Sequence, residues 1–241
     1  MTKTSGSFGA RAMNSGQLRE QILSFGASEV GFFHVPQDYR DDLLTREGGA
    51  GLGFGISIVV ALSKTVLGAI TDKPTFAYFH HYRTVNALID QIVLRTGLLI
   101  AQAGFSYLPV AASQSTQGYR GLFSHKAGAR LAGLGGIGKN GLFLSDTYGA
   151  AVRLGTILTD QPLPQGKKAY NTRCSGCNIC RAVCPAMAIS GMEFDEGNAN
   201  NRIVDAAACS AYMKKHFQHI GRGVVCGICI KNCPASRIES T

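Results

Sequence analysis

Eight cysteines, none of them before position 174, constrain this chain more than any other feature of its sequence. The first four form the run Cys174-x2-Cys177-x2-Cys180-x3-Cys184-Pro185, and the last three form Cys226-x2-Cys229-x3-Cys233-Pro234, with Cys209 alone before them. The first run has the ligand spacing of bacterial ferredoxins, in which three thiolates hold one cluster and the fourth cysteine reaches the other. The spacing therefore predicts two [4Fe–4S] clusters.

The same rule assigns each cysteine to a cluster. Cluster one takes Cys174, Cys177, Cys180 and Cys233. Cluster two takes Cys184, Cys209, Cys226 and Cys229, with Cys209 supplied from a helix over about 205–219 that Asp205 can cap. Zinc and disulfides are the alternatives. A zinc site needs two cysteine pairs and leaves the third cysteine and the Cys-Pro ends unexplained, and disulfides are rare in a chain without an export signal.

The residues before the cysteines predict a separate α/β domain. A loop over 161–168 contains two prolines and a glycine, and we place a boundary there, between an α/β domain at 1–165 and a double-cluster ferredoxin-type domain at 166–241. Helical and strand patterns alternate in the first part, which favours a sheet with helices packed on it. We expect helices over 14–25, 82–103 and 126–132, and strands over 29–35, 54–62, 106–111 and 153–159.

Composition narrows the possible partners. No apolar run approaches the roughly 18 residues that a membrane span needs, and the N-terminus lacks a signal peptide, so we expect a cytoplasmic protein with no membrane partner. The formal charge is +9, which suits an anionic cofactor or an acidic redox partner. No basic run has interleaved aromatic residues, so a nucleic-acid partner is not expected.

A glycine-rich loop over 133–141 is the main candidate ligand site before the cysteines. Five glycines allow a backbone to approach a flat or phosphate-bearing ligand, although plain tight turns have the same composition. No strand pattern leads into the loop and no acidic residue follows at the required distance, so a dinucleotide site is not indicated. Residues 91–145 contain no acidic residue, which indicates either an anion-binding wall or a solvated basic face; the basic residues there are Arg95, Arg120, His125, Lys126, Arg130 and Lys139.

Residues 126–160 resemble the segment that precedes the clusters in epoxyqueuosine reductases. The matching residues are the loop 133–140 (GLGGIGKN), Arg153-Leu154-Gly155 and Leu158-Thr159-Asp160, and the cysteine order also matches, including the lone Cys209. Those enzymes are cobalamin-dependent iron–sulfur proteins related to reductive dehalogenases. The resemblance implies a nitroreductase-like α/β fold, base-off cobalamin, and clusters that pass on electrons from a donor such as ferredoxin or flavodoxin; flavin is the less favoured cofactor.

Several residues become site candidates on this basis. Contacts to the cofactor are expected from the loop and from a polar–aromatic stretch before it, with structural roles as the alternative; the residues are Gly133, Gly135, Gly136, Ile137, Gly138, Lys139, Asn140, His81 and Arg83. Epoxyqueuosine reductases have a proton-donating Asp upstream of the loop, where this chain has Tyr119, and they carry a helical-repeat extension after the clusters that has no counterpart here. Reductive dehalogenases use a Tyr as proton donor. Tyr119 and His125 are therefore the catalytic candidates.

The expected function is that of a corrinoid-dependent oxidoreductase that reduces a small substrate. Two alternatives remain open at this point. The chain could be a corrinoid reductase that activates a cobalamin, or an electron-transfer protein without a substrate of its own.

Overall fold

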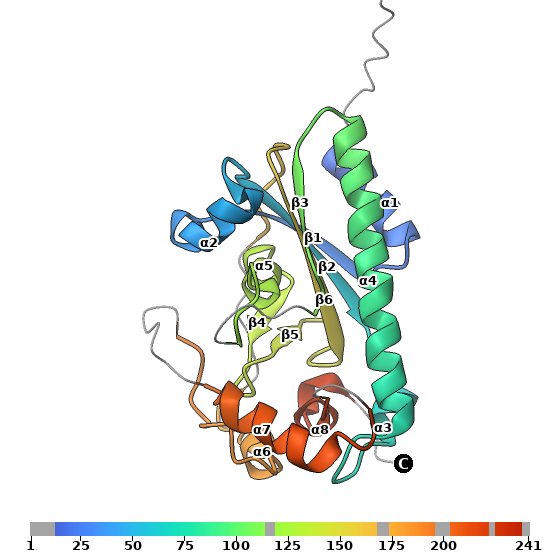
Figure 1. The fold of residues 1–241 in the computed structure, drawn as a ribbon, viewed down its shortest axis with the longest axis vertical. Coiled ribbons are helices and arrows are strands. Elements are labelled where there is room, and N and C mark those ends of the chain that lie inside the picture. The colour runs from blue at the N-terminus through green and yellow to red at the C-terminus, as the bar shows by residue number, and fades with distance from the viewer. Residues whose placement is uncertain (1–12, 114–118, 168–173, 196–202, 222–224, 238–241) are drawn as a thin grey trace, which may run out of the picture.

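A computed structural model describes residues 13–113, 119–167, 174–195, 203–221 and 225–237. Its centre is a four-stranded antiparallel sheet with the strand order β1-β2-β6-β3 (Figure 1). The strands are β1 (Glu29–His34), β2 (Phe54–Ala61), β3 (Tyr107–Val110) and β6 (Val152–Thr159). The expected strands and the α/β class are confirmed.

Helices cover both faces of this sheet. The long helix α4 (Phe76–Gln102) and α1 (Ser15–Ser24) lie on one face, and α5 (His125–Leu131) lies on the other. Strand β2 is apolar on both faces except for the buried Ser57, because Ile56 and Ile58 enter the core on one face, while Val59 packs with Ala129 of α5 on the other. Gly155 allows α4 to approach β6, since a Cβ atom there would lie 2.5 Å from Cγ2 of Ile89.

Helix α4 starts earlier than the sequence pattern indicates. The side chain of Thr75 caps it by accepting a hydrogen bond from the Tyr78 amide at 3.0 Å. The aromatic and polar residues of its first turns obscure the helical periodicity in the sequence.

Against our expectation, α4 is long and apolar enough to cross a membrane by length and composition, with a mean hydropathy of 1.3. Its residues Ile89, Ile92 and Val93 are buried in the core, and a core helix has the same composition.

The glycine loop is a hairpin rather than an irregular loop. Strands β4 (Gly135–Ile137) and β5 (Phe143–Ser145) pair antiparallel and form a second sheet. Gly135 has a φ of 153°, and a Cβ atom there would collide with the carbonyl oxygen of Leu144. Glycine is therefore required at this position by the close approach of the two strands.

The cysteine-rich segment shares its core with the rest of the molecule. Phe217, Ile220 and Ile228 belong to the same buried cluster as Leu67 and Tyr78. Before this segment, the Gly166 amide donates a hydrogen bond to the carbonyl oxygen of Phe32 at 3.0 Å. The chain at the expected domain boundary, 165–166, therefore packs against β1. The helices here are α6 (Ile179–Ala182), α7 (Ala206–Phe217, capped by Asp205) and α8 (Ile228–Lys231). Short elements complete the fold: α2 (Asp42–Leu44), α3 (Lys64–Gly68), η1 (Gln37–Tyr39), η2 (Thr45–Gly49) and η4 (Pro234–Ser236).

Candidate cofactor site

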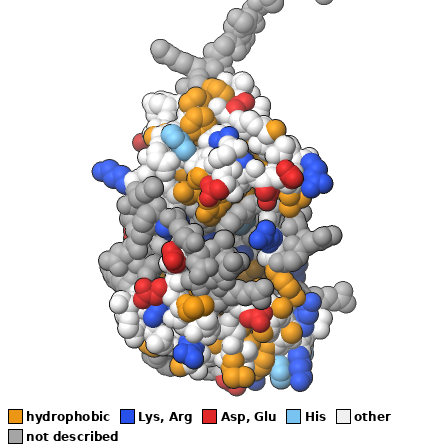
Figure 2. All heavy atoms as spheres, turned by 90° about the vertical axis from the view of Figure 1, so that its left-hand side faces the viewer, with side chains coloured by type: hydrophobic (Ala, Val, Ile, Leu, Met, Phe, Trp, Pro, Cys, Tyr) orange, Lys and Arg blue, Asp and Glu red, His pale blue; other side chains and the backbone are white. Residues whose placement is uncertain are grey.

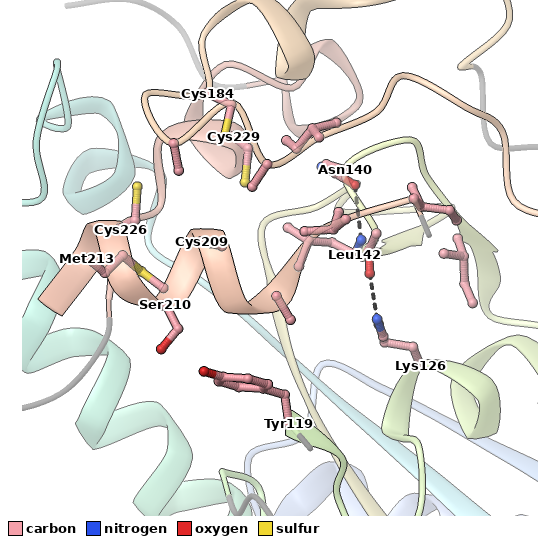
Figure 3. Close-up of a pocket in the computed structure, with 18 of the residues that line it drawn as sticks. Tyr119, Lys126, Asn140, Leu142, Cys184, Cys209, Ser210, Met213, Cys226 and Cys229 are labelled. Atoms are coloured by element: carbon pink, nitrogen blue, oxygen red, sulfur yellow. Dashed lines mark hydrogen bonds between the residues drawn. The ribbon is translucent and has the colours of Figure 1, made fainter. Parts of the chain in front are cut away.

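The main cavity lies between the glycine hairpin and the cysteine-rich segment and has a volume of about 720 Å³. Figure 3 shows α7 with its Cys209, Ser210 and Met213 on one side, and the hairpin tip with Asn140 on the other. Its labelled wall residues are Tyr119, Lys126, Asn140, Leu142, Cys184, Cys209, Ser210, Met213, Cys226 and Cys229. One cavity thus joins the two parts of the chain in which the sequence indicates ligand chemistry.

The eight thiols fall into two electrostatically coupled groups. The thiol of Cys180 interacts with those of Cys174, Cys177 and Cys233. A second group joins Cys226 and Cys229 to Cys184 and Cys209, and Cys229 also interacts with Cys180, where the two groups adjoin. These groups have the same members as the two ligand sets that the crossed rule gives, and the second group lines the main cavity.

Burial disfavours the ionised form of the Cys226 and Cys229 thiols. It raises the pKa of Cys226 to about 11 and raises the pKa of Cys229 further. Without a metal the thiols of Cys226 and Cys229 are therefore protonated at neutral pH, and metal binding must displace their protons.

The thiols can also be compared with the ligands of a single metal ion. Among the described residues, no group of three His, Cys, Asp or Glu side chains is arranged to hold one ion. A cubane cluster takes four thiolates, and each of the two groups contains four cysteines.

Tyr119 stands where the main cavity meets a second one. The second cavity has a volume of about 590 Å³ and shares the side chains of Tyr39, Tyr119, Ser124 and Lys126 with the first. The hydroxyl of Tyr119 points toward Ser210 (Figure 3). Tyr119 is 56% exposed and has a φ of 62°. A bulky side chain in this backbone region is uncommon and is a reason to consider a function.

Lys126 lines the site, although the sequence identified it only as one of the basic residues in the acid-free segment 91–145. Its Nζ atom donates a hydrogen bond to the carbonyl oxygen of Gly141 at 2.7 Å. The side chain faces the cavities and is enclosed by their walls, and this desolvation lowers its pKa. The only feature of the sequence that pointed to Lys126 was the absence of acidic residues around it. Tyr39, Ser210 and Met213 were missed altogether.

His125 lines the second cavity, and both of its ring nitrogens have protein partners. Its Nε2–H donates to the carbonyl oxygen of Ala111 at 2.9 Å, and Nδ1 lies 2.8 Å from the hydroxyl of Thr156. Burial lowers the pKa of His125, so the neutral ring accepts the Thr156 proton at Nδ1. Both nitrogens are engaged with protein, which favours a positioning role, and the catalytic role of His125 stays a prediction.

His81 and Arg83 lie on α4 outside both cavity walls. The Nε2 atom of His81 accepts the amide of Ser63 at 3.0 Å, and its pKa is lowered by burial and by the adjacent His80. The guanidinium of Arg83 lies over the ring of Phe79 at 5.7 Å. The structure gives His81 and Arg83 contacts within the protein, and their expected contacts with a cofactor stay a prediction.

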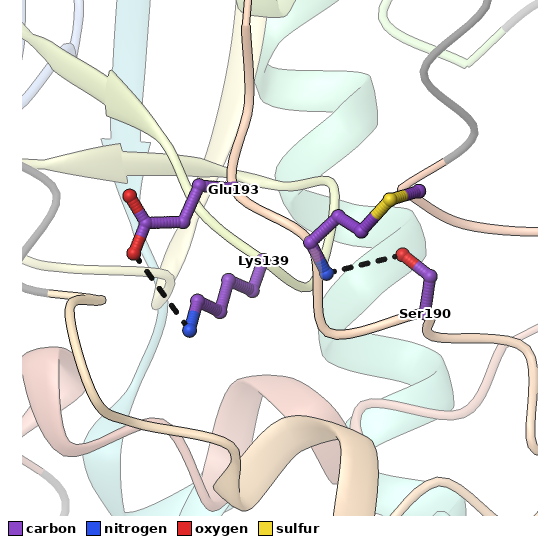
Figure 4. Close-up of polar contacts among 4 residues, drawn as sticks. Lys139, Ser190 and Glu193 are labelled. Atoms are coloured by element: carbon purple, nitrogen blue, oxygen red, sulfur yellow. Dashed lines mark hydrogen bonds and ion pairs between the residues drawn. The ribbon is translucent and has the colours of Figure 1, made fainter.

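The expected loop residues divide between two cavities. Ile137 and Asn140 line the main cavity, while Gly136, Ile137 and Lys139 line a small one of about 130 Å³ next to Cys174. Lys139 pairs with Glu193 at 3.8 Å (Figure 4). The three remaining glycines pack against neighbouring protein atoms and line neither cavity: Gly133, Gly135 and Gly138.

Comparisons with known proteins agree with these features. No protein-family model matches the sequence. The epoxyqueuosine reductase of Synechococcus sp. is 32% identical over 230 residues, which cover 92% of this chain and 66% of that protein. The epoxyqueuosine reductase of Synechocystis sp. is 37% identical over 92 residues, which cover 38% of this chain and 28% of that protein. The chain spans less than two thirds of the length of these relatives.

Solved structures show the same fold. A catabolic reductive dehalogenase superposes with a TM-score of 0.73 at 16% identity, covering 98% of this chain and 34% of the other. An epoxyqueuosine reductase from Bacillus subtilis superposes with a TM-score of 0.57 at 18% identity, covering 92% and 65%. This chain belongs to the epoxyqueuosine reductase-like family and shares its fold with the reductive dehalogenases.

Proposed function

We propose that this protein is a corrinoid- and iron–sulfur-dependent oxidoreductase that holds base-off cobalamin in the main cavity and reduces a small substrate. One observation carries the proposal: the cysteines of cluster two, the tip of the glycine hairpin and Tyr119 line the same cavity. The relatives point to the same chemistry, since one neighbour is a reductive dehalogenase described as B12-dependent.

The described residues fit these groups. Each set of four coupled cysteines offers the thiolate ligands of one cubane cluster. The hairpin tip offers the side chain of Asn140 and the backbone of Gly141 to the amide-rich edge of a corrin ring. Among the described residues, the main cavity wall contains no histidine, which suits a corrinoid without a histidine ligand.

When bound, the corrinoid supplies a cobalt centre that changes its oxidation state in single-electron steps. A cluster held by Cys184, Cys209, Cys226 and Cys229 would lie at the wall of the main cavity, whereas none of the cluster-one cysteines lines that cavity. Lys126 fixes the hairpin tip through the carbonyl of Gly141. Tyr119 holds a proton on its hydroxyl oxygen at the junction of the two cavities.

The second cavity favours an enzyme over a corrinoid reductase without its own substrate. It gives a small molecule about 590 Å³ of space beside Tyr119. The neighbour solved with a modified tRNA stem loop acts on a much larger molecule. On the face shown in Figure 2, basic side chains are interspersed with acidic ones and form no continuous patch, which favours a small substrate here.

The test is a titration of the anaerobically reconstituted protein with cobalamin. Base-off binding shifts the visible absorption of cobalamin to shorter wavelength. Ala206→Trp introduces an indole into the cavity wall and should weaken binding at least tenfold. The control is Ala207→Trp, because Ala207 is also exposed on α7 but does not line the cavity. A titration without a spectral shift, or purification with stoichiometric flavin, would contradict the proposal.

A further inference from the structure

We propose that the surface around cluster one is the docking site for an acidic one-electron carrier protein of the ferredoxin or flavodoxin type. We call this surface the docking face and define it by Ile179, Arg181, Met187 and Lys231. The inference rests on the proposed function, to which it adds the place where electrons arrive and the partner that brings them.

The positions of the two cysteine groups set the order of electron flow. All four cysteines of cluster two line the main cavity, and none of the cluster-one cysteines does. Cluster one is therefore farther from the cofactor site. The loop that carries its first ligands is open to solvent at Ser175, Gly176 and Asn178. An external carrier that reaches this side of the molecule meets cluster one first.

Apolar side chains are exposed beside this loop. Met187 is 89% exposed and Ile179 is 42% exposed. Met187 also has a φ of 49°, a backbone conformation that a non-glycine residue rarely adopts. The turn that holds it follows α6 directly, with the Met187 amide donating to Cys184 and the Cys184 amide donating to Arg181. An apolar side chain held in solvent on a constrained turn is suited to contact a partner.

Helices α6 and α8 carry only basic charges, while the acidic Glu193, which lines a small cavity with Cys174, is paired with Lys139. Residues 174–190 and 225–237 contain Arg181, Lys231 and Arg237, and no Asp or Glu. Helices α6 and α8, which carry Arg181 and Lys231 in their last turns, contact each other. The chain as a whole has a formal charge of +9. A basic rim around an apolar centre attracts and orients an acidic carrier, as in other transient redox encounters with small interfaces.

The step at this surface is a simple electron transfer. One electron leaves the reduced carrier and enters cluster one, so the carrier is oxidised and the cluster is reduced by the same amount. No bond forms or breaks. The carrier then dissociates, which a small interface allows.

The test compares binding and electron transfer for two double variants of the reconstituted protein. Met187→Asp with Arg181→Glu should weaken the binding of an oxidised bacterial flavodoxin and of an acidic bacterial ferredoxin at least tenfold. It should lower the rate of cluster reduction by the reduced carriers to the same extent. Reduction by dithionite should be unchanged. The matched control is Leu98→Asp with Arg46→Glu, because both residues are exposed and lie far from the cysteines in the sequence.

Two checks keep the result unambiguous. Iron content and the absorption spectrum show whether the clusters survive, and Met187→Asp alone provides a milder variant if Arg181→Glu disturbs the adjacent Cys180. Unchanged carrier binding in the docking-face variant would overturn this inference while leaving cobalamin binding intact. So would a failure of both carriers to reduce clusters that dithionite reduces. Loss of carrier binding in a protein that does not bind cobalamin would instead support the docking face and overturn the proposed function.

Discussion

Lys126 donates a hydrogen bond from Nζ to the carbonyl oxygen of Gly141 at 2.7 Å, and this contact joins the first turn of α5 to the tip of the glycine hairpin. Because Lys126 lines both cavities, the contact lies where the cofactor and substrate spaces meet. The Lys126 ammonium group is therefore bound by a neutral carbonyl oxygen, in surroundings whose desolvation disfavours its charge.

This environment makes Lys126 unusually reactive for a lysine. Desolvation lowers its pKa below the ordinary value of 10.5. In competitive acetylation followed by mass spectrometry, its amine should reach half-maximal reactivity at a lower pH than that of a lysine peptide. Bound cobalamin should protect it. Half-maximal reactivity at the pH of the peptide would show that the walls do not desolvate the amine.

The crossed cysteine groups give a second prediction. In Cys233→Ala, cluster one loses a ligand, so Cys174, Cys177 and Cys180 should become open to alkylation while Cys184 and Cys226 stay protected. The reciprocal variant Cys226→Ala should expose the cluster-two cysteines, and both variants should lose about half of the iron. Alkylation mapped by mass spectrometry distinguishes the outcomes. Exposure of Cys226 and Cys229 in Cys233→Ala would refute the crossing.

The sequence is most informative where the signal is local. The Cys-x2-Cys spacing predicts thiols that the fold gathers into two groups of four. Strands β2 and β6 are largely buried and were predicted nearly to the residue. By contrast, the strands of the glycine hairpin are three residues long and rich in glycine, so they carry no strand pattern.

The candidate site was harder to predict because tertiary packing assembles it. Tyr39, Ser210 and Met213 come from distant segments, and nothing in their local sequence connects them with Lys126 or Asn140. His125 and His81 show the opposite problem. Both residues are site candidates in the sequence. In the fold, their imidazole rings form hydrogen bonds with backbone groups or with a hydroxyl group of the protein.

His125 makes the stability of the fold depend on pH. Its pKa is lowered from the ordinary 6.5, so the folded state binds fewer protons than the unfolded state as the pH falls below 6.5. The free energy of unfolding should therefore be fully retained above pH 6.5 and should decrease as the pH falls from 6.5 toward the lowered pKa. Chemical denaturation at a series of pH values measures this dependence.

The matched variant for this prediction is His125→Asn, which removes the titrating group while keeping an amide that can donate and accept. It should be less stable than the unaltered protein at neutral pH because the geometry of the ring is lost. Its stability should vary less with pH in the same window. An equal slope in both proteins would mean that another group causes the dependence.

A substitution at Tyr119 can distinguish an enzyme with its own substrate from a corrinoid reductase. A phenol is a much weaker acid than a carboxylic acid, so it can protonate only a strongly basic product such as a carbanion. If Tyr119 is the proton donor of an enzyme, Tyr119→Phe should lower turnover by about 10²–10⁴-fold, the usual contribution of general acid catalysis. The ring and its contacts with the cavity remain, so cobalamin binding and cobalt reduction should be unchanged.

The control is Tyr39→Phe, since Tyr39 lines the same two cavities from a different segment. A loss specific to Tyr119→Phe, with the rate of cobalt reduction unaffected, identifies the hydroxyl as a donor to substrate. Equal cobalt reduction in both variants together with no substrate consumption by the unaltered protein would support the corrinoid-reductase alternative. Because we expect Tyr119 to stand where the related enzymes have their proton-donating aspartate, we also expect no reduction of epoxyqueuosine in tRNA. Turnover of that substrate at a normal rate would show that a phenol suffices in place of the carboxylic acid.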